Sequence, residues 1–230
     1  MPKKVDAESR RQQVVEALFR VAVREGLARV SLRTVADEAN LNIGSVRHYF
    51  DSQSELMRFA MRAMLDRVAD RVRVRLADLD VTRHAPPADR TRHAVALLCE
   101  LLPMDERRRA EVTVFVDFAA LSRTNADLHD LAAEAAIGTR AAARQVLAYL
   151  AGGADDDADV ETERLTSLVD GLGLNAVLHP DLVTAAGTER VLTAHLTALA
   201  ARHSAPTDGQ AERQRSNSSG VRTPPSSTAR

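Results

Sequence analysis

The chain has 230 residues, a formal net charge of −1, 45% apolar residues and only 3% aromatic residues. This length allows one large or two small domains with a buried core, and the composition is ordinary for a soluble globular protein. A single cysteine excludes an internal disulfide framework, and no apolar run is long enough to span a bilayer. The N-terminal MPKKVDAESRRQQ lacks the apolar segment of a secretory signal, so we expect a cytoplasmic protein without membrane partners.

Charge is distributed unevenly along the chain. Residues 1–50 carry nine Lys and Arg against six Asp and Glu, whereas residues 51–205 carry 18 against 24. A basic N-terminal unit on an acidic body predicts that only the first part meets a polyanion. A surface of mixed charge would also tolerate this difference, so the charge alone does not decide between the two interpretations.

Apolar residues recur at helical spacing throughout the chain, which predicts an all-α fold. In the first helix the stripe includes Val15, Leu18 and Ala22, and Gly26 stands where a C-terminal cap belongs. Ser31 is expected to cap a second helix.

A break at residues 40–42 follows, and Asn42 is expected to cap a short third helix. A long fourth helix is expected over about 53–79. Later helices are predicted over about 88–102, 105–122, 125–151, 159–178, and from Thr184 or Thr188 to about Arg202. The tail from Ser204 is rich in Ser, Pro, Thr, Arg and Gln, and we expect it to be disordered.

Residues 31–50 have the anatomy of a helix-turn-helix. Two short helices joined by a tight polar turn can place the exposed face of the second helix in a DNA major groove. Gly44 and Ser45 leave room for close approach, and Val46 and Phe50 are spaced to anchor the same helix inward. The adjoining Arg47-His48-Tyr49 is then expected to project outward as hydrogen-bond donors to phosphates or base edges.

These residues resemble the tetracycline-repressor (TetR) family of bacterial transcriptional regulators. The resemblance covers about residues 10–60 and rests on VSLRTVADEA at 30–39, IGSVRHYF at 43–50 and SQSEL at 52–56. It implies an all-helical homodimer with a three-helix DNA-binding head and a larger helical body that binds a small effector.

The resemblance also implies which residues contact DNA. The family's groove and phosphate contacts fall on Arg33, Thr34, Ile43, Gly44, Ser45, Arg47, His48, Tyr49 and Gln53. The family often has Tyr at the position of Arg47 and Lys at the position of Gln53. Arg47 can replace a phosphate contact and add charge, whereas Gln53 can donate only a neutral hydrogen bond, which weakens the salt-dependent part of binding there.

In the body, LVDGLGLNAVLHP at 168–180 and VLTAHL at 191–196 resemble the last two helices of the BetI-like branch. That resemblance implies a four-helix dimer interface formed with the symmetry mates of these helices. The residues expected in it are Leu165, Leu168, Leu172, Ala176, Leu192, Leu196 and Leu199. The spacing alone would equally fit the core of a monomer.

An effector pocket is expected among the middle helices, with an apolar lining and a few polar groups. The residues proposed for it are Val114, Phe115, Asp117, Phe118, Leu121 and Asn175. Each of these residue types is more often found in ordinary packing or at the surface.

The sequence argues against an enzyme. It has no phosphate-binding glycine loop, no nucleophile elbow and no paired Cys/His spacing, so neither a cofactor nor a metal is expected. We therefore predict a head over 1–52, a ligand-binding and dimerisation domain over 53–203 and a disordered tail over 204–230.

The function predicted from these observations is a ligand-responsive DNA-binding regulator, most simply a homodimeric repressor released from a palindromic operator by a small molecule. Activation would use the same parts. The alternative is an all-helical scaffold protein without DNA binding, which leaves residues 31–50 unexplained.

Overall fold

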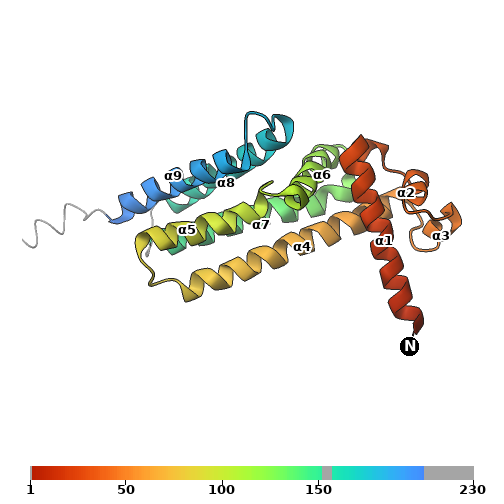
Figure 1. Ribbon diagram of the computed structural model, residues 1–230, viewed down its shortest axis with the longest axis horizontal. Coiled ribbons are helices and arrows are strands. Elements are labelled where there is room, and N and C mark those ends of the chain that lie inside the picture. Colours follow the sequence, from red (N-terminus) through yellow and green to blue (C-terminus); the bar gives the residue numbers. More distant parts are fainter. Residues whose placement is uncertain (1, 152–156, 205–230) are drawn as a thin grey trace, which may run out of the picture.

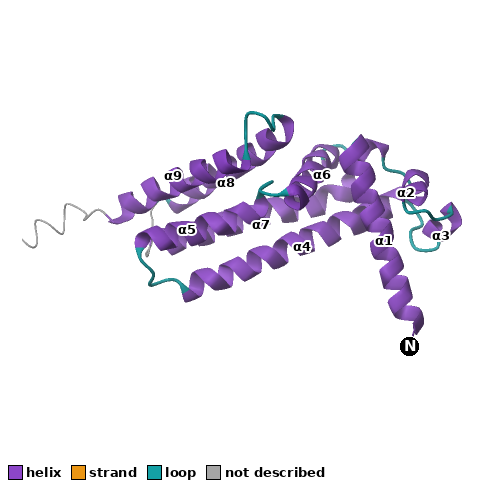
Figure 2. Ribbon diagram, viewed as in Figure 1, coloured by secondary structure: helices purple, strands orange, loops and turns teal. Residues whose placement is uncertain are grey.

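The computed structural model describes residues 2–151 and 157–204, and every regular element in these residues is a helix (Figure 2). This confirms the all-α prediction. The α-helices are α1 Pro2–Glu25, α2 Leu32–Glu38, α3 Ile43–Arg47, α4 Gln53–Val81, α5 Pro87–Leu98, α6 Glu106–Ser122, α7 His129–Ala151, α8 Ala158–Leu178 and α9 Ala185–Ser204. Three 3-10 turns are η1 Leu27–Arg29, η2 Cys99–Leu101 and η3 Ala126–Leu128. The predicted disorder of the tail concerns residues outside the described part, apart from Ser204.

The helix ends near the N-terminus follow the local rules that the sequence suggested. Gly26 ends α1 with φ 87°, a backbone conformation that favours glycine. Ser31 accepts a hydrogen bond from the Thr34 N–H at 3.1 Å and caps α2. Ser52 does the same for α4, accepting from the Glu55 N–H at 3.1 Å. Side-chain caps of this kind satisfy backbone donors that the first helical turn leaves free.

Two predicted helices of the body are divided in the structure. The helix expected over 88–102 ends at Leu98 and continues as the tighter turn η2. The helix expected over 125–151 opens with η3, where the Asn125 side chain accepts a hydrogen bond from the Asp127 N–H at 3.1 Å. Short 3-10 turns at helix ends are common and leave no strong mark in hydrophobic spacing.

Figure 1 shows a long body formed by α4 to α9, with α1, α2 and α3 grouped at one end. The buried apolar side chains form two clusters rather than one. The cluster at the head joins α1, α2 and α3 with the first half of α4, with Val114 and Phe118 of α6, and with Leu128 and Leu131. The second cluster joins the end of α4 with α5, α7, α8 and α9. α4 begins at Gln53, where the sequence analysis places the end of the head. The apolar cluster of the head nevertheless includes residues of α4, α6 and α7, which all come after that boundary.

A half-buried ionic group ties α4 to η2 and α6. Arg71 of α4 contacts Glu111 of α6 at 2.6 Å and Glu100 of η2 at 3.4 Å. Arg75 contacts the other oxygen of Glu100 at 3.0 Å. Both carboxylate side chains are about nine-tenths buried, and each has a further arginine partner, Arg108 for Glu100 and Arg107 for Glu111. On α4, Arg71 stands between Met64 of the first cluster and Leu79 of the second.

Cys99 is buried, and desolvation raises the pKa of its thiol to about 11 from an ordinary value of 9.0. At pH 8 the thiolate fraction is therefore about a hundredfold lower than in the unfolded chain, and we expect correspondingly slow alkylation of the native protein by iodoacetamide. Mass spectrometry of timed aliquots with and without urea measures this. Equal rates in the two conditions would contradict the burial of this thiol.

Candidate nucleic-acid interface

The turn between α2 and α3 is built by Asn40 and Leu41. Asn40 has φ 56°, the left-handed conformation that asparagine tolerates better than other side chains. Its N–H donates to the Asp37 carbonyl at 3.2 Å, and the Leu41 N–H donates to the Ala36 carbonyl at 2.9 Å. This pair of bonds is the Schellman arrangement that closes a helix and turns the chain sharply.

The start of α3 and its inward anchors agree with the sequence prediction. Asn42 accepts hydrogen bonds from the Ser45 N–H at 2.7 Å and from the Ser45 hydroxyl at 3.1 Å. Val46 is fully buried and Phe50 is 2% exposed, both within the head's apolar cluster. The helix is therefore held from behind, and its opposite surface is open to solvent.

That open surface is formed by Ile43, Gly44, Arg47 and His48, all exposed. Ile43 is a large apolar side chain that is 39% exposed, and it lies beside the exposed Arg47 on the same short helix. Tyr49 differs from the prediction that it projects outward. Its ring is half-buried against the head's core and lies edge-on to the His48 ring at a centroid distance of 5.1 Å.

Two of the predicted DNA contacts already make internal hydrogen bonds. The Thr34 hydroxyl accepts from the Ser31 N–H at 2.9 Å, completing a reciprocal cap of α2. The Ser45 hydroxyl donates to Asn42, which leaves its lone pairs as the remaining groups for a partner. Gly44 also has an internal reason to be small, because a Cβ there would lie 3.2 Å from the Asn42 side-chain oxygen.

Charge on the head separates into paired and unpaired arginines. Arg20 and Arg24 both bind Glu38, at 2.7 and 3.0 Å, and their hydrogen bonds hold the pKa of that carboxyl below its usual range. Among the side chains of residues 9–151 and 157–202, neither Arg33 nor Arg47 has a salt-bridge partner, and both are exposed. One of these positive charges thus lies near the start of α2 and the other at the end of α3, without a counterion among those side chains. Gln53, the first residue of α4, is exposed at the same end of the molecule.

Of the six residues proposed for an effector pocket, five lie on α6 next to the head and the sixth lies on α8. Val114 and Phe118 are fully buried in the head's apolar cluster, and Phe115 and Leu121 pack against it. Asp117 accepts a hydrogen bond from the Leu27 N–H of the head. Asn175 is exposed on α8, where its amide donates to the Gly171 carbonyl.

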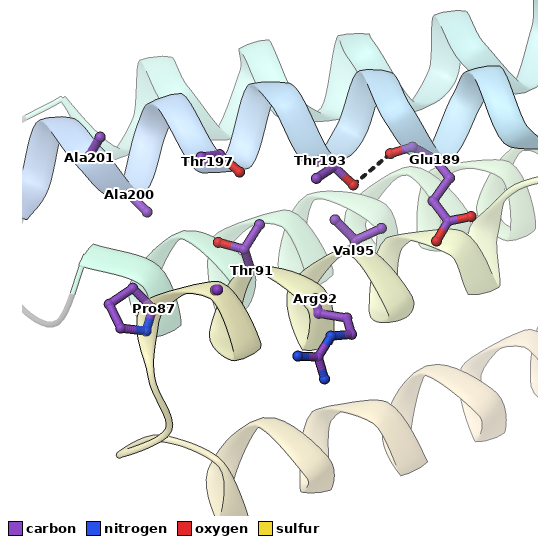
Figure 3. Close-up of a pocket in the computed structure, with 10 residues that line it drawn as sticks. Pro87, Thr91, Arg92, Val95, Glu189, Thr193, Thr197, Ala200 and Ala201 are labelled. Carbon is purple, nitrogen blue, oxygen red and sulfur yellow. Dashed lines mark hydrogen bonds between the residues drawn. The ribbon is translucent and has the colours of Figure 1, made fainter.

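A groove of about 480 Å³ lies instead between α5 and α9 (Figure 3). Alkyl groups and threonine hydroxyls form most of its lining. The residues that line it are Pro87, Ala88, Thr91, Arg92, Val95, Glu189, Thr193, Thr197, Ala200 and Ala201. This groove was not predicted from the sequence, although Thr193 and Thr197 stand four residues apart on one helix face.

Most of the residues predicted for the dimer interface are buried within a single chain. Leu165, Leu192, Leu196 and Leu199 are fully buried and Ala176 is 2% exposed within a single chain. They pack in the second apolar cluster of the same chain, except Ala176, which is buried outside that cluster. Leu168 and Leu172 are partly buried and pack against the same core.

The described part of the chain offers neither a membrane-spanning helix nor a metal site. None of its helices is long and apolar enough to cross a bilayer. No three potential metal-binding side chains gather in residues 2–151 and 157–204.

Comparison with known families matches both parts of the chain. Residues 14–58 match the family described as bacterial regulatory proteins, tetR family. Residues 87–201 match the C-terminal domain of BetI-type transcriptional repressors. Among curated relatives, the HTH-type transcriptional regulator PksA of Bacillus subtilis is 36% identical over 203 residues, covering 86% of this chain and 94% of PksA.

Solved structures have the same fold. A transcriptional regulator from Rhodococcus sp. Rha1 aligns with a TM-score of 0.72 and 29% identity, over 85% of this chain and 99% of that one. A protein from Saccharomonospora viridis, crystallised in complex with choline, aligns with a TM-score of 0.68 and 23% identity, over 80% and 94% of the two chains.

Replacing Arg47 with alanine tests its predicted contact with phosphate. We expect weaker DNA binding and a slope of log affinity against log salt that is smaller by about one, because one fewer counterion is released. Fluorescence anisotropy over a salt series measures both quantities. Arg83→Ala is the matched control, since Arg83 is an exposed arginine just beyond the far end of α4. An unchanged salt slope in Arg47→Ala would refute the assignment.

Proposed function

Because the chain belongs to the TetR family of transcriptional regulators and has a BetI-type C-terminal domain, we propose that it acts as a homodimeric repressor released from DNA by a small molecule. The family consists of regulators rather than enzymes, which agrees with the sequence prediction. The observation that carries the proposal is the surface of α3, where exposed Ile43, Arg47 and His48 lie opposite the buried anchors Val46 and Phe50. An internal scaffold helix would have no reason to expose this combination.

In the proposed complex, two copies place their α3 helices in successive major grooves of a palindromic operator. Two-fold symmetric helix-turn-helix proteins meet half-sites about 34–36 Å apart. Arg33 and Arg47, which lack internal counterions in the described residues, would meet phosphates on either side of the groove. We assign the protein to the cytoplasm, where the operator would lie.

We place the dimer interface on the outward faces of α8 and α9, next to the stripes that the monomer buries. On α8 this face includes Gly171, Leu174 and Leu178, with Leu174 42% and Leu178 56% exposed. On α9 it includes Val191, which is 44% exposed, and Ala194. Exposed leucines beside small residues allow two helices to approach closely and bury apolar surface.

We propose the groove between α5 and α9 as the place where an effector enters the body. α5 continues directly into η2, where Glu100 holds Arg71 and Arg75 of α4. A ligand that separates α5 from α9 would therefore move Glu100 relative to the helix that leads to the head. Only a difference in ligand affinity between the DNA-binding and released states can drive that shift. The choline complex of the Saccharomonospora viridis protein supports a small-molecule site in this fold.

A mobility-shift experiment on the DNA upstream of the protein's own gene tests the function. We expect a specific complex that competitor DNA of unrelated sequence does not displace. Folded, dimeric protein that gives neither a shift there nor enrichment at any site in a genome-wide binding experiment would contradict the proposal.

Two glycines provide a matched test of the dimer interface. A Cβ added at Gly171 of α8 or at Gly138 of α7 would meet nothing within 4 Å, so both positions tolerate a side chain in the isolated chain. We expect Gly171→Glu to shift the protein from dimer to monomer, because it places a charge at the proposed contact. Gly138→Glu should leave the dimer intact.

Analytical ultracentrifugation at micromolar concentration measures the fractions of monomer and dimer in each variant. A wild-type monomer, or a Gly171→Glu variant that is as dimeric as the wild type, would contradict this interface.

A further inference from the structure

The core of the DNA-binding head is completed by a helix of the body. Val114 and Phe118 of α6 are fully buried in the same cluster as Leu18 of α1 and Val46 of α3. Figure 1 shows α6 lying beside the upper end of α1. A shift of α6 therefore cannot leave the head's packing unchanged, because buried side chains in close contact transmit displacement.

One hydrogen bond joins α6 to the backbone of the head. Asp117 Oδ2 accepts from the Leu27 N–H at 2.9 Å, across 90 positions of sequence. Leu27 opens η1, the turn that links α1 to α2, and its N–H is one of the donors that a helical turn leaves without an internal partner. Gly26 has no side chain that could cap η1. The Asp117 carboxylate, which belongs to the body, caps η1 in its place.

The geometry of η1 determines where α2 and α3 lie. Gly26 has φ 87° and sets the direction in which the chain leaves α1, and Asp117 Oδ2 lies 3.6 Å from the position of a Cβ on residue 26. From η1 the chain enters α2, whose C-terminal turn leads directly to α3. The orientation of α3 relative to the body therefore depends on the contact between η1 and α6.

The polar contacts that hold the start of α4, which follows the head directly, are more exposed. Ser54 binds Asp127 at 2.9 Å, and Arg58 binds both carboxylate oxygens of Asp130 at 2.6 and 2.7 Å. These residues join the start of α4 to η3 and α7, and the Asp130 side chain is 61% exposed. Salt screens such exposed pairs strongly. By contrast, Asp117 accepts its hydrogen bond from Leu27, a residue that is only 1% exposed. Water therefore replaces this hydrogen bond less easily.

We propose that Asp117 is a positioning residue for DNA recognition, which fixes the separation of the two α3 helices in the dimer by holding η1 against α6. The inference rests on the proposed homodimer on a palindromic operator and extends it. Asp117 does not touch DNA. It determines which spacing between half-sites the dimer accepts, whereas the α3 side chains determine which bases each half-site contains.

The test measures affinity for operators of different spacing. An operator selected from a random duplex library is prepared in three forms, with its half-sites at the selected spacing, one base pair closer and one base pair farther apart. The wild type is expected to favour the selected spacing by about tenfold, because one base pair rotates and translates the second half-site. Asp117→Ala is expected to reduce this preference to about threefold or less, and to bind a single half-site as the wild type does.

Asp117→Asn is the rescue variant, because its carbonyl oxygen can still accept the Leu27 N–H and should restore the spacing preference. Asp117→Glu is a second variant that keeps the charge but moves the acceptor by one methylene, and it should lose the preference. Glu106→Ala, which removes an exposed carboxylate at the start of the same helix, is the matched control. Thermal unfolding and ultracentrifugation establish that each variant is folded and dimeric.

Different outcomes separate this inference from the function on which it rests. If the wild type prefers one spacing and folded Asp117→Ala and Asp117→Glu prefer it equally, the positioning role is wrong and the proposed function stands. If Asp117→Asn behaves like Asp117→Ala, the hydrogen bond is not the cause and the inference also fails. If the wild type binds no spacing better than another, the palindromic operator and this inference fail together.

Discussion

The structure depends on the apolar cluster of the head, which residues of the body complete. Three helices of the head cannot bury their own apolar faces, since α2 has only 7 residues and α3 has 5. Phe118 and Val114 of α6, with Leu128 and Leu131 beyond it, close that core. The head is therefore not an independent module attached by a linker. The head, the first half of α4 and the parts of α6 and α7 that pack against it form one structural unit.

This shared core gives a physical route from the body to the DNA-binding surface. The second apolar cluster holds α5, α7, α8 and α9 together, and the ionic group of Arg71, Glu100 and Glu111 joins η2 and α6 to the part of α4 that lies between the two clusters. Buried charges tolerate small displacements poorly, because lost partners are not replaced by solvent. A movement of α5 and η2 would therefore displace α4 and α6 together. Both of these helices contribute side chains to the apolar cluster of the head.

Local features of the sequence predicted the helix-turn-helix well, because the residues that build it act on their own neighbours. Ser31, Asn42 and Gly26 cap or end helices through atoms a few positions away, and such short-range chemistry can be inferred from residue type and spacing. Tyr49 was the exception, since its half-burial depends on how α3 packs against the rest of the head.

Partners distant in sequence could not be predicted in this way. The spacing of Leu192, Leu196 and Leu199 shows that one face of α9 is apolar, but it does not tell whether α5 and α7 or a second subunit covers that face. The sequence predicts a pocket that includes Asp117 and Phe118, because they are a polar and an apolar residue in the middle of the body. Their actual partners are a backbone N–H 90 residues away and the core of the head.

Native-state hydrogen exchange in rising urea concentrations tests the shared core most directly. Amides of α1 and α2 should lose protection in the same step, and with the same free energy of opening, as the amides around Val114 and Phe118 of α6. If α1 and α2 instead open at lower urea while this part of α6 stays protected, the head has a core of its own and does not share one with the body.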